Sequence, residues 1–283
     1  MKKKVSFLLI ALLVALAALT GCSSGGDGDK DGGDGAGGGE ELKVVKVGAS
    51  PAPHAEILAV AKEILADEGY DLQITEFQDY VLPNTAVDTG DIDANYFQHR
   101  QYLQDFNAKN GTKLTEVVGV HYEPFGVYAG KTDSLENLAD GARIGVPNDP
   151  TNEGRALLLL QDLGLIKLSE DAGLEGTILD ITENPKNLDI VELEAATLVR
   201  ALSDTDVAVI NGNYAIEGGL SVADALAVES ADSNTGEIYT NVLVVNEGHE
   251  NDEGIKALAE ALCSDKVKAF IEETYGGAVV PVF

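Results

Sequence analysis

The 283-residue chain contains no tryptophan, only two cysteines and few basic residues. It has 19 lysines and arginines against 48 aspartates and glutamates, so its formal net charge is −29. A field of this sign repels nucleic acid and anionic lipid headgroups, and neither is an expected partner of the folded part. The interpretation that we favour for the acidity is that it keeps a surface protein soluble.

The cysteines and histidines give no sign of a disulfide, a metal site or a cofactor. Cys263 lies in residues 255–270, where apolar residues recur at helical spacing, which indicates a small core residue. If Cys22 is modified, Cys263 has no partner and no disulfide forms. The histidines show no HxH, HExxH or CxxC grouping, so no metal site is predicted. They are His54, His99, His121 and His249.

Motifs of common enzymes are also missing. The sequence has no GxSxG elbow, no GxxxxGK[ST] loop and no cysteine with a catalytic helper. Because many hydrolases lack such motifs, a surface enzyme or an adhesin stays open as an alternative. His99 is its only candidate base, and the sequence identifies no acidic partner for it. We therefore predict a binding protein rather than an enzyme.

The N-terminus carries a short apolar run, residues 5–19, below the ~20 residues that a membrane-spanning helix needs. A KKK stretch at residues 2–4 precedes the run, and LTGC at residues 19–22 ends it. This order is typical of a bacterial lipoprotein signal, cleaved before Cys22, with diacylglycerol on the cysteine sulfur. We predict a signal peptide over residues 1–21 and an extracytoplasmic, lipid-anchored protein. An ordinary signal peptide with a cysteine at its cleavage site is the alternative.

Beyond Cys22, residues 23–41 are glycine, aspartate and serine with almost nothing apolar, which predicts a flexible tether over 22–41. From residue 42 onward, strand and helix patterns alternate, which favours an α/β fold. The predicted strands are residues 42–49, 72–77, 91–96, 143–146, 177–181, 190–193, 206–210 and 241–245. The predicted helices are residues 55–65, 81–89, 99–107, 152–163, 195–202 and 255–270.

The alternation runs twice through about a hundred residues, which predicts two lobes. We place the first lobe at residues 42–125 and the second at 126–238. By pattern alone residues 239–283 could return to either lobe, and we assign them to the first. A chain that crosses twice between lobes makes a hinged cleft, the usual place for a small ligand.

Aromatic residues gather where strands of the first lobe end. Tyr80 lies in a turn before a helix, and Phe97, His99 and Tyr102 lie at a strand-to-helix junction. Open α/β sheets bind ligands at this carboxyl edge. In a helix over 99–107, His99 and Tyr102 would share one face. Simple core packing of these rings is the alternative.

The second lobe offers a cation and amides. In residues 147–155 (PNDPTNEGR), a turn leads into a helix whose first turn holds Asn152 and Arg155. A helix N-terminus with an arginine can grip a carboxylate, although Arg155 could instead pair with a local acid such as Glu153. Asn211 follows another strand and can hold an ammonium or a carboxylate. Together the two lobes suggest a zwitterion with an apolar side chain.

Five segments resemble the NlpA-type methionine-binding lipoproteins of bacterial ABC importers. They are 79–84 (DYVLPN), 90–99 (GDIDANYFQH), 146–155 (VPNDPTNEGR), 183–188 (ENPKNL) and 207–214 (VAVINGNY). The resemblance implies a two-lobed periplasmic-binding-protein fold of type II-like architecture, which binds L-methionine and delivers it to a permease driven by an ATPase.

Carried over by position, the resemblance implies that Arg155 and Asn152 hold the ligand carboxylate and that Asn211 holds its ammonium or carboxylate. It implies that aromatic side chains wall the thioether and that Asn241 adds a polar contact. Those aromatic side chains are Tyr80, Phe97, His99 and Tyr102. Relatives also take a methionine-containing dipeptide or other amino acids, so these are the alternative ligands. We expect a monomer.

Overall fold

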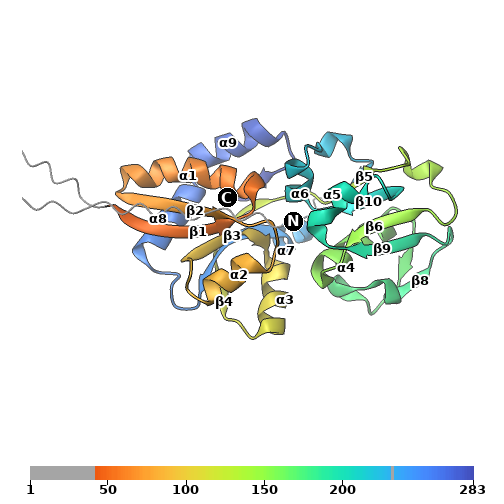
Figure 1. Cartoon of the computed structure of the whole chain (residues 1–283), viewed down its shortest axis with the longest axis horizontal. Helices are drawn as coiled ribbons and strands as arrows, with labels where there is room; N and C mark the ends of the chain where they lie inside the picture. Colours follow the sequence, from red (N-terminus) through yellow and green to blue (C-terminus); the bar gives the residue numbers. More distant parts are fainter. Residues whose placement is uncertain (1–41, 231–232) are drawn as a thin grey trace, which may run out of the picture. The chain divides into compact units, whose positions relative to one another are not determined.

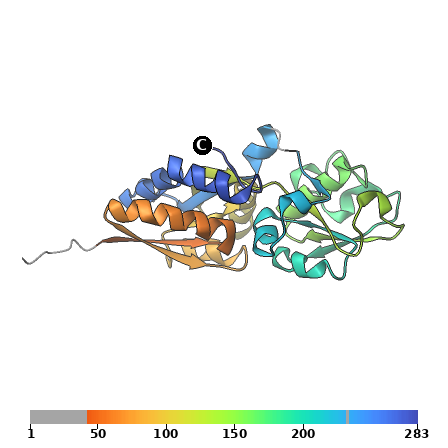
Figure 2. The same cartoon turned by 90° about the horizontal axis from the view of Figure 1, so that it is seen from above.

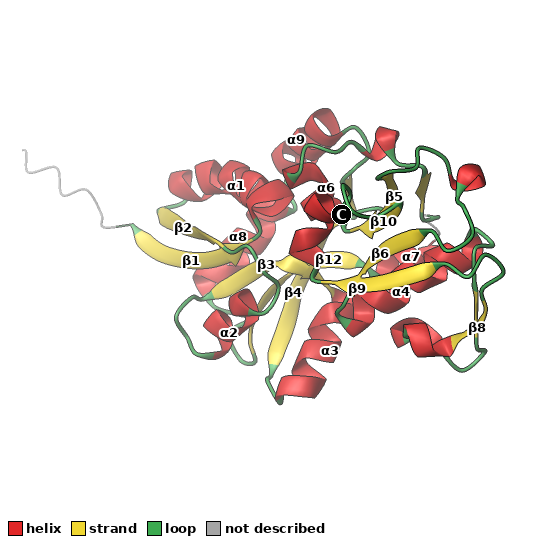
Figure 3. Ribbon diagram, turned by 45° about the vertical axis from the view of Figure 1, so that its right-hand side comes forward, coloured by secondary structure: helices red, strands yellow, loops and turns green. Residues whose placement is uncertain are grey.

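The computed structural model describes residues 42–230 and 233–283. The predicted signal peptide, Cys22 and the tether of residues 22–41 lie outside the described residues. Within them, the chain forms two larger β-sheets, each flanked by helices (Figures 1 and 3). In the part that is described, we find no helix with the length and apolar character needed to cross a membrane.

The first sheet has six strands in the order β13-β4-β12-β3-β1-β2. Its strands are β1 (Lys43–Ala49), β2 (Tyr70–Glu76), β3 (Ala94–His99), β4 (Leu114–Tyr122), β12 (Thr240–Asn246) and β13 (Val280–Pro281). β1 pairs in parallel with β2 and β3, and β12 is antiparallel to both β3 and β4. β12, from the C-terminal segment, therefore lies inside this sheet, between β4 and β3.

Helices cover both faces of the first sheet (Figure 1). They are η1 (Pro51–Ala55), α1 (Glu56–Asp67), α2 (Leu82–Asp88), α3 (Arg100–Asn110), α8 (Glu253–Leu262) and α9 (Asp265–Tyr275). On β12, Leu243 and Val245 pack into the core with α1, α8 and α9, whereas Val242 and Val244 pack with α2 and α3. Successive strand side chains point to opposite faces, so a strand buried on both sides needs this unbroken apolar run.

The second sheet has five strands in the order β11-β5-β10-β6-β9. Its strands are β5 (Gly126–Ala129), β6 (Arg143–Pro147), β9 (Asp189–Leu193), β10 (Val207–Ile210) and β11 (Ala227–Val228). Its helices are α4 (Pro150–Asp162), α5 (Leu198–Ala201), α6 (Gly212–Glu217) and short 3-10 turns at Leu135–Asn137, Gly173–Glu175, Ile178–Asp180, Ala195–Thr197 and Val222–Asp224. β7 (Lys167–Leu168) and β8 (Ile181–Glu183) form a separate ribbon.

The chain passes between the two sheets twice. It leaves the first sheet after β4, through residues 123–125, and returns between β11 and β12, a stretch that includes α7 (Ser233–Ile238). Figure 2 shows the two sheets with their own helices side by side. The carboxyl ends of β3, β6 and β10 lead directly into the residues described below as the pocket.

Three sequence predictions need correction. Residues 177–181 are not a strand, because the Thr177 side chain accepts from the Leu179 N–H and Asp180 accepts from the Thr177 N–H, which closes a 3-10 turn. The helical pattern of the C-terminal segment breaks into α8 and α9, since the Ser264 hydroxyl caps a new helix by accepting from Val267 N–H. β4 was not predicted, because five of its nine residues are only half-buried and show no clean alternation.

Candidate functional site

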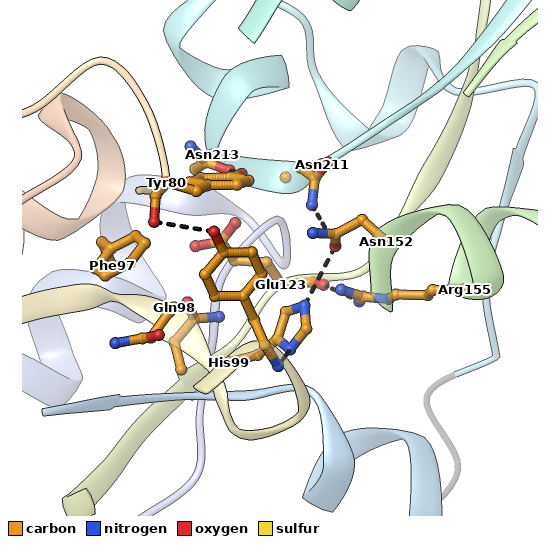
Figure 4. A pocket seen from close by; sticks show the side chains of 12 residues that line it. Tyr80, Phe97, Gln98, His99, Glu123, Asn152, Arg155, Asn211 and Asn213 are labelled. Carbon is orange, nitrogen blue, oxygen red and sulfur yellow. Dashed lines mark hydrogen bonds between the residues drawn. The ribbon is translucent and has the colours of Figure 1, made fainter. Parts of the chain in front are cut away.

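A small pocket lies where residues of the two lobes meet, with an enclosed volume of about 20 Å³. This is the space of about one water molecule, so a larger ligand would enter only if the two lobes moved apart. Both lobes contribute to its wall (Figure 4). The lining residues are Tyr80, Phe97, Gln98, His99, Tyr102, Glu123, Asn152, Arg155, Asn211, Gly212, Asn213 and Asn241.

Three rings from the first lobe form the apolar wall. Tyr80 packs against Phe97 and Tyr102 with ring centroids 5.9 and 5.7 Å apart. The Asp79 carboxylate accepts hydrogen bonds from two following backbone N–H groups, at 2.7 and 2.8 Å, and this turn presents Tyr80 to the pocket. The Tyr80 hydroxyl donates to Asn213 Oδ1 of the second lobe at 2.5 Å. The wall is thus tied to the opposite lobe.

His99 is the last residue of β3 and caps α3, rather than lying on a helix face as predicted. Its Nδ1 accepts from the Tyr102 N–H at 3.1 Å, so the ring proton is on Nε2, which faces Asn152 Oδ1 at 3.2 Å. Burial, with Arg155 adding to it, lowers the pKa of His99 to about 3. A neutral ring with both nitrogens engaged is a bridge between lobes and a poor general base.

At the start of α4, both polar atoms of the Asn152 amide contact protein groups. Its Nδ2 donates to both Asp149 carboxylate oxygens at 3.0 Å, and its Oδ1 accepts from Asn211 Nδ2 at 2.8 Å. Figure 4 shows Asn211, Asn152 and His99 in one hydrogen-bonded chain. This leaves Asn211 Oδ1 buried without a partner among the described residues. The two oxygens of the Asp149 carboxylate are too close together to use both N–H groups of the Asn152 amide, so they share one N–H and the second is open to a ligand.

Arg155 lies in the second turn of α4 and lines the pocket, with only 5% of its side chain exposed. Its Nε donates to Glu229 Oε2 at 3.0 Å, and its Nη2 donates to Glu229 Oε1 and to the Glu123 carbonyl. The guanidinium also packs over the Tyr239 ring, with 4.1 Å to its centroid. Nη1 has no hydrogen bond to a described residue and stays available to a ligand.

The acid that holds Arg155 is therefore Glu229 and not the local Glu153. Burial acts to lower the pKa of Arg155, but the attraction of Glu229 outweighs it and raises the pKa. Glu229 also accepts from the hydroxyl of Tyr122, the last residue of β4, and from the Phe125 N–H in the first crossing between the sheets. The pair thus fixes the guanidinium and joins both crossings.

Glu153 does not pair with Arg155, and its protonation makes the stability of the folded protein depend on pH. It accepts from the Ile178 N–H at 3.0 Å, and burial, together with Glu192, raises its pKa to about 7. In the folded protein Glu153 keeps its proton up to about pH 7, whereas in the unfolded chain it loses the proton near pH 4.5. Proton binding by Glu153 therefore favours the folded state below pH 4.5, and this stabilisation is lost as pH rises through about 7. We expect Glu153→Gln to unfold at a higher temperature than wild type at pH 8 and at the same temperature near pH 4.

Thermal unfolding at the two pH values tests this, with exposed Glu170→Gln as the matched control. The glutamine keeps an acceptor for Ile178, so the packing is conserved. A difference of equal size at both pH values would contradict the proton-linked explanation.

Glu123 supplies the negative charge of the pocket, and no sequence motif identifies it. It is 5% exposed and lies in the first crossing. Its Oε1 accepts from His121 Nε2 at 2.7 Å, and a Cβ on Gly212 would lie 2.8 Å from Oε2, so only glycine fits there. Burial raises the pKa of Glu123, whereas His54, the Asn213 N–H and Arg155 act in the opposite direction.

All eight residues predicted from the sequence line this one pocket, and four others join them: Gln98, Glu123, Gly212 and Asn213. Gln98 and Asn213 are neighbours of predicted residues on β3 and α6. Asn213 Nδ2, like Asn211 Oδ1, is buried with no partner among the described residues. Unpaired buried donors and acceptors are costly, which indicates that a ligand completes them.

The pocket therefore pairs opposite charges around an apolar wall. Arg155 Nη1 and Asn213 Nδ2 are free donors, and Glu123 and Asn211 Oδ1 are acceptors. A ligand with a carboxylate, an ammonium and a short apolar chain matches this arrangement, since each buried charge needs a partner. Two lobes with a pocket between them define the class of the two-lobed substrate-binding proteins.

The chain belongs to the NlpA lipoprotein family, whose model matches residues 45–283. It is 40% identical to the D-methionine-binding lipoprotein MetQ of Escherichia coli K12 over 279 residues, 97% of each chain. A lipoprotein of known structure from Ruminococcus gnavus is 54% identical, with a TM-score of 0.84 over 86% of this chain and 100% of the other. A nutrient-binding protein of Burkholderia cenocepacia, solved bound to methionine, is 44% identical, with a TM-score of 0.81 over 84% and 100%.

Proposed function

We propose that this protein is the extracytoplasmic substrate-binding lipoprotein of an ABC importer, which binds L-methionine and delivers it to the permease and its ATPase. The observation that carries the proposal is the pair of buried opposite charges, Arg155 and Glu123, that line one small pocket beside three aromatic rings. The 44% identity to a protein solved with methionine supports the ligand.

In the proposed complex, the ligand carboxylate binds the free edge of Arg155. The ammonium lies between Glu123 and Asn211 Oδ1, which are acceptors. The thioether packs against the rings of Tyr80 and Phe97, where sulfur–aromatic contacts contribute ~0.3–1.5 kcal/mol beyond burial. Asn152 orients Asn211 through its Oδ1 in this arrangement, and its second N–H can contact the ligand carboxylate, the role that the resemblance implies.

Binding rather than catalysis fits the chemistry of the pocket. His99 has both nitrogens engaged, and burial lowers its pKa to about 3. Delivery to a permease requires that the protein stay near the membrane, and we propose that a lipid on Cys22 anchors it while residues 23–41 give it reach. We propose that it acts as a monomer.

The ligand is identified by retention. The purified protein is unfolded to release any bound molecule, refolded, incubated with an equimolar mixture of the common amino acids, D-methionine and Gly-Met, and washed. Chiral chromatography coupled to mass spectrometry of the molecules released by a second unfolding should show L-methionine at about one per protein. Retention of D-methionine, Gly-Met or another amino acid would keep the role and change the ligand, whereas retention of none would contradict the proposal.

A further inference from the structure

Behind the pocket, a buried cluster surrounds the Glu123 carboxylate. It joins His54 from η1, His121 from β4 and Tyr96 from β3, with exposed fractions of 1%, 0% and 0%. The sequence separates these residues widely, and histidine spacing could not reveal the group. None of them except Glu123 lines the pocket.

With Glu123 ionised, the hydrogen bonds of His121 run in one direction. Its Nε2 lies 2.7 Å from Glu123 Oε1, and its Nδ1 faces the Tyr96 hydroxyl. A bare Nε2 lone pair would repel the carboxylate, so Nε2 carries the proton. Nδ1 must then accept from the tyrosine, whose pKa burial raises well above 10, so that its hydroxyl stays protonated. Tyr96 donates to His121, and His121 donates to Glu123.

His54 approaches the same carboxylate from the other side. Its Nε2 lies 3.0 Å from Asn241 Oδ1 and 3.5 Å from Glu123 Oε1, both acceptors, so this nitrogen also carries a proton. Its Nδ1 is buried without a partner among the described residues, and a second proton there would have no acceptor. Burial accordingly lowers the pKa of His54 to about 4 and that of His121 to about 3.

His121 thus donates to the Glu123 carboxylate, and His54 lies 3.5 Å from it while it donates to Asn241, so two neutral rings adjoin the carboxylate without cancelling its charge. A charged histidine in their place would neutralise Glu123 within the protein and leave nothing for a cationic group in the pocket. The hydrogen bond from His121 fixes Oε1, while Oε2 lies beside Gly212, which lines the pocket. Buried charges persist only where such hydrogen bonds replace water.

The ligand atoms of His54, His121 and Glu123 lie within 4.8 Å of one another, as they would in a metal site. Tetrahedral zinc at its usual bond lengths separates its ligand atoms by about 3.4 Å. The 2.7 Å between His121 Nε2 and Glu123 Oε1 is instead a hydrogen-bond distance. Protons, not a metal ion, account for this cluster.

We infer that His121, His54 and Tyr96 are positioning residues that hold the Glu123 carboxylate ionised and oriented toward the pocket. In this way, groups outside the pocket set the selectivity for ligands with an α-ammonium. The inference rests on the proposed function, because it assumes that Glu123 meets the ligand's ammonium. It makes a specific claim of its own: the cluster affects recognition of the amino group and not of the carboxylate or the side chain.

The test compares L-methionine with 4-(methylthio)butanoate, which is methionine without its amino group, by isothermal titration calorimetry. Wild type should prefer methionine strongly. In His121→Phe we expect this preference to fall by at least about 10-fold, with affinity for the des-amino compound unchanged within about threefold. His121→Gln keeps an N–H of similar reach and should restore most of the preference.

Tyr96→Phe provides a near-isosteric variant in case His121→Phe does not fold. It removes only the hydroxyl that sets the His121 tautomer, and we expect the preference for methionine to fall by about threefold. Tyr70→Phe, on a ring that is half-buried at the start of β2, is the matched control and should leave the preference unchanged.

Three results would overturn the inference. One is equal weakening for both compounds in the His121 and Tyr96 variants, which would mark a merely structural role. Another is an unchanged preference in all of them. The third is a stoichiometric transition metal in wild type that is lost in His121→Phe. If wild type binds neither compound, the proposed function fails first, and this inference fails with it.

Discussion

Removing the guanidinium of Arg155 should abolish methionine binding. In Arg155→Ala the ligand carboxylate would enter a buried site with no cation, and truncating one partner of such a pair costs 2–5 kcal/mol or more. We expect the affinity to fall by at least about 100-fold in calorimetric titration. Arg143→Ala, which removes an exposed arginine paired with Asp189, is the matched control and should bind as wild type does.

Loss of binding must be separated from loss of folding, because Arg155→Ala also leaves the buried Glu229 carboxylate without its cation. An uncompensated buried charge destabilises by about 3–5 kcal/mol. The double variant Arg155→Ala with Glu229→Gln removes both charges, so we expect it to regain much of the thermal stability and none of the binding. Recovery of binding in the double variant would mean that Arg155 serves the fold and not the ligand.

Glu123→Gln should weaken binding while it stabilises the protein. The carboxylate is buried, and burial raises its pKa, so a neutral amide of the same shape removes a desolvation cost at neutral pH. The ligand's ammonium loses its counter-charge, and we expect about 30- to 100-fold weaker binding of methionine. Opposite changes in stability and affinity are typical of a residue kept for function.

The pH profile gives a second check on Glu123. Because its folded-state pKa is raised above the usual 4.5, the carboxylate takes up a proton before the pH falls to that value, and methionine affinity should decline there. Glu123→Gln should show a flat profile over the same range, and exposed Glu183→Gln should follow wild type. A decline of the same size in Glu123→Gln would assign the titration to another group.

Helices and strands whose apolar pattern depends on their own burial could be predicted from the sequence. Apolar runs and helical spacing identify β1, α1, β6, α4 and β10, because each element's pattern depends on its own burial. Residues at or after the carboxyl ends of such strands gather at the edges of the two sheets, so Tyr80, Phe97, Arg155 and Asn211 could be named together. The N-cap position of His99 was missed, since a histidine that accepts from its own helix has no strong sequence signature.

The pairings that tune the site could not be predicted in this way. Arg155 and Glu229 lie 74 residues apart, and His54 and Asn241 lie 187 apart. Among 48 acidic residues, the sequence does not distinguish Glu123 or Glu229 from those on the surface. Only the two crossings between the sheets bring these residues together, and their geometry depends on the whole fold.

The central claim is that the pocket binds a methionine-type zwitterion, and a thermal-shift titration of ligand-stripped protein tests it most directly. At a hundred-fold excess over Kd, a ligand stabilises by ~2.7 kcal/mol, which raises the midpoint by about 5–10 °C for a domain of this size. We expect that shift with L-methionine and little or none with 4-(methylthio)butanoate. No shift with methionine, any other amino acid or Gly-Met would contradict the account.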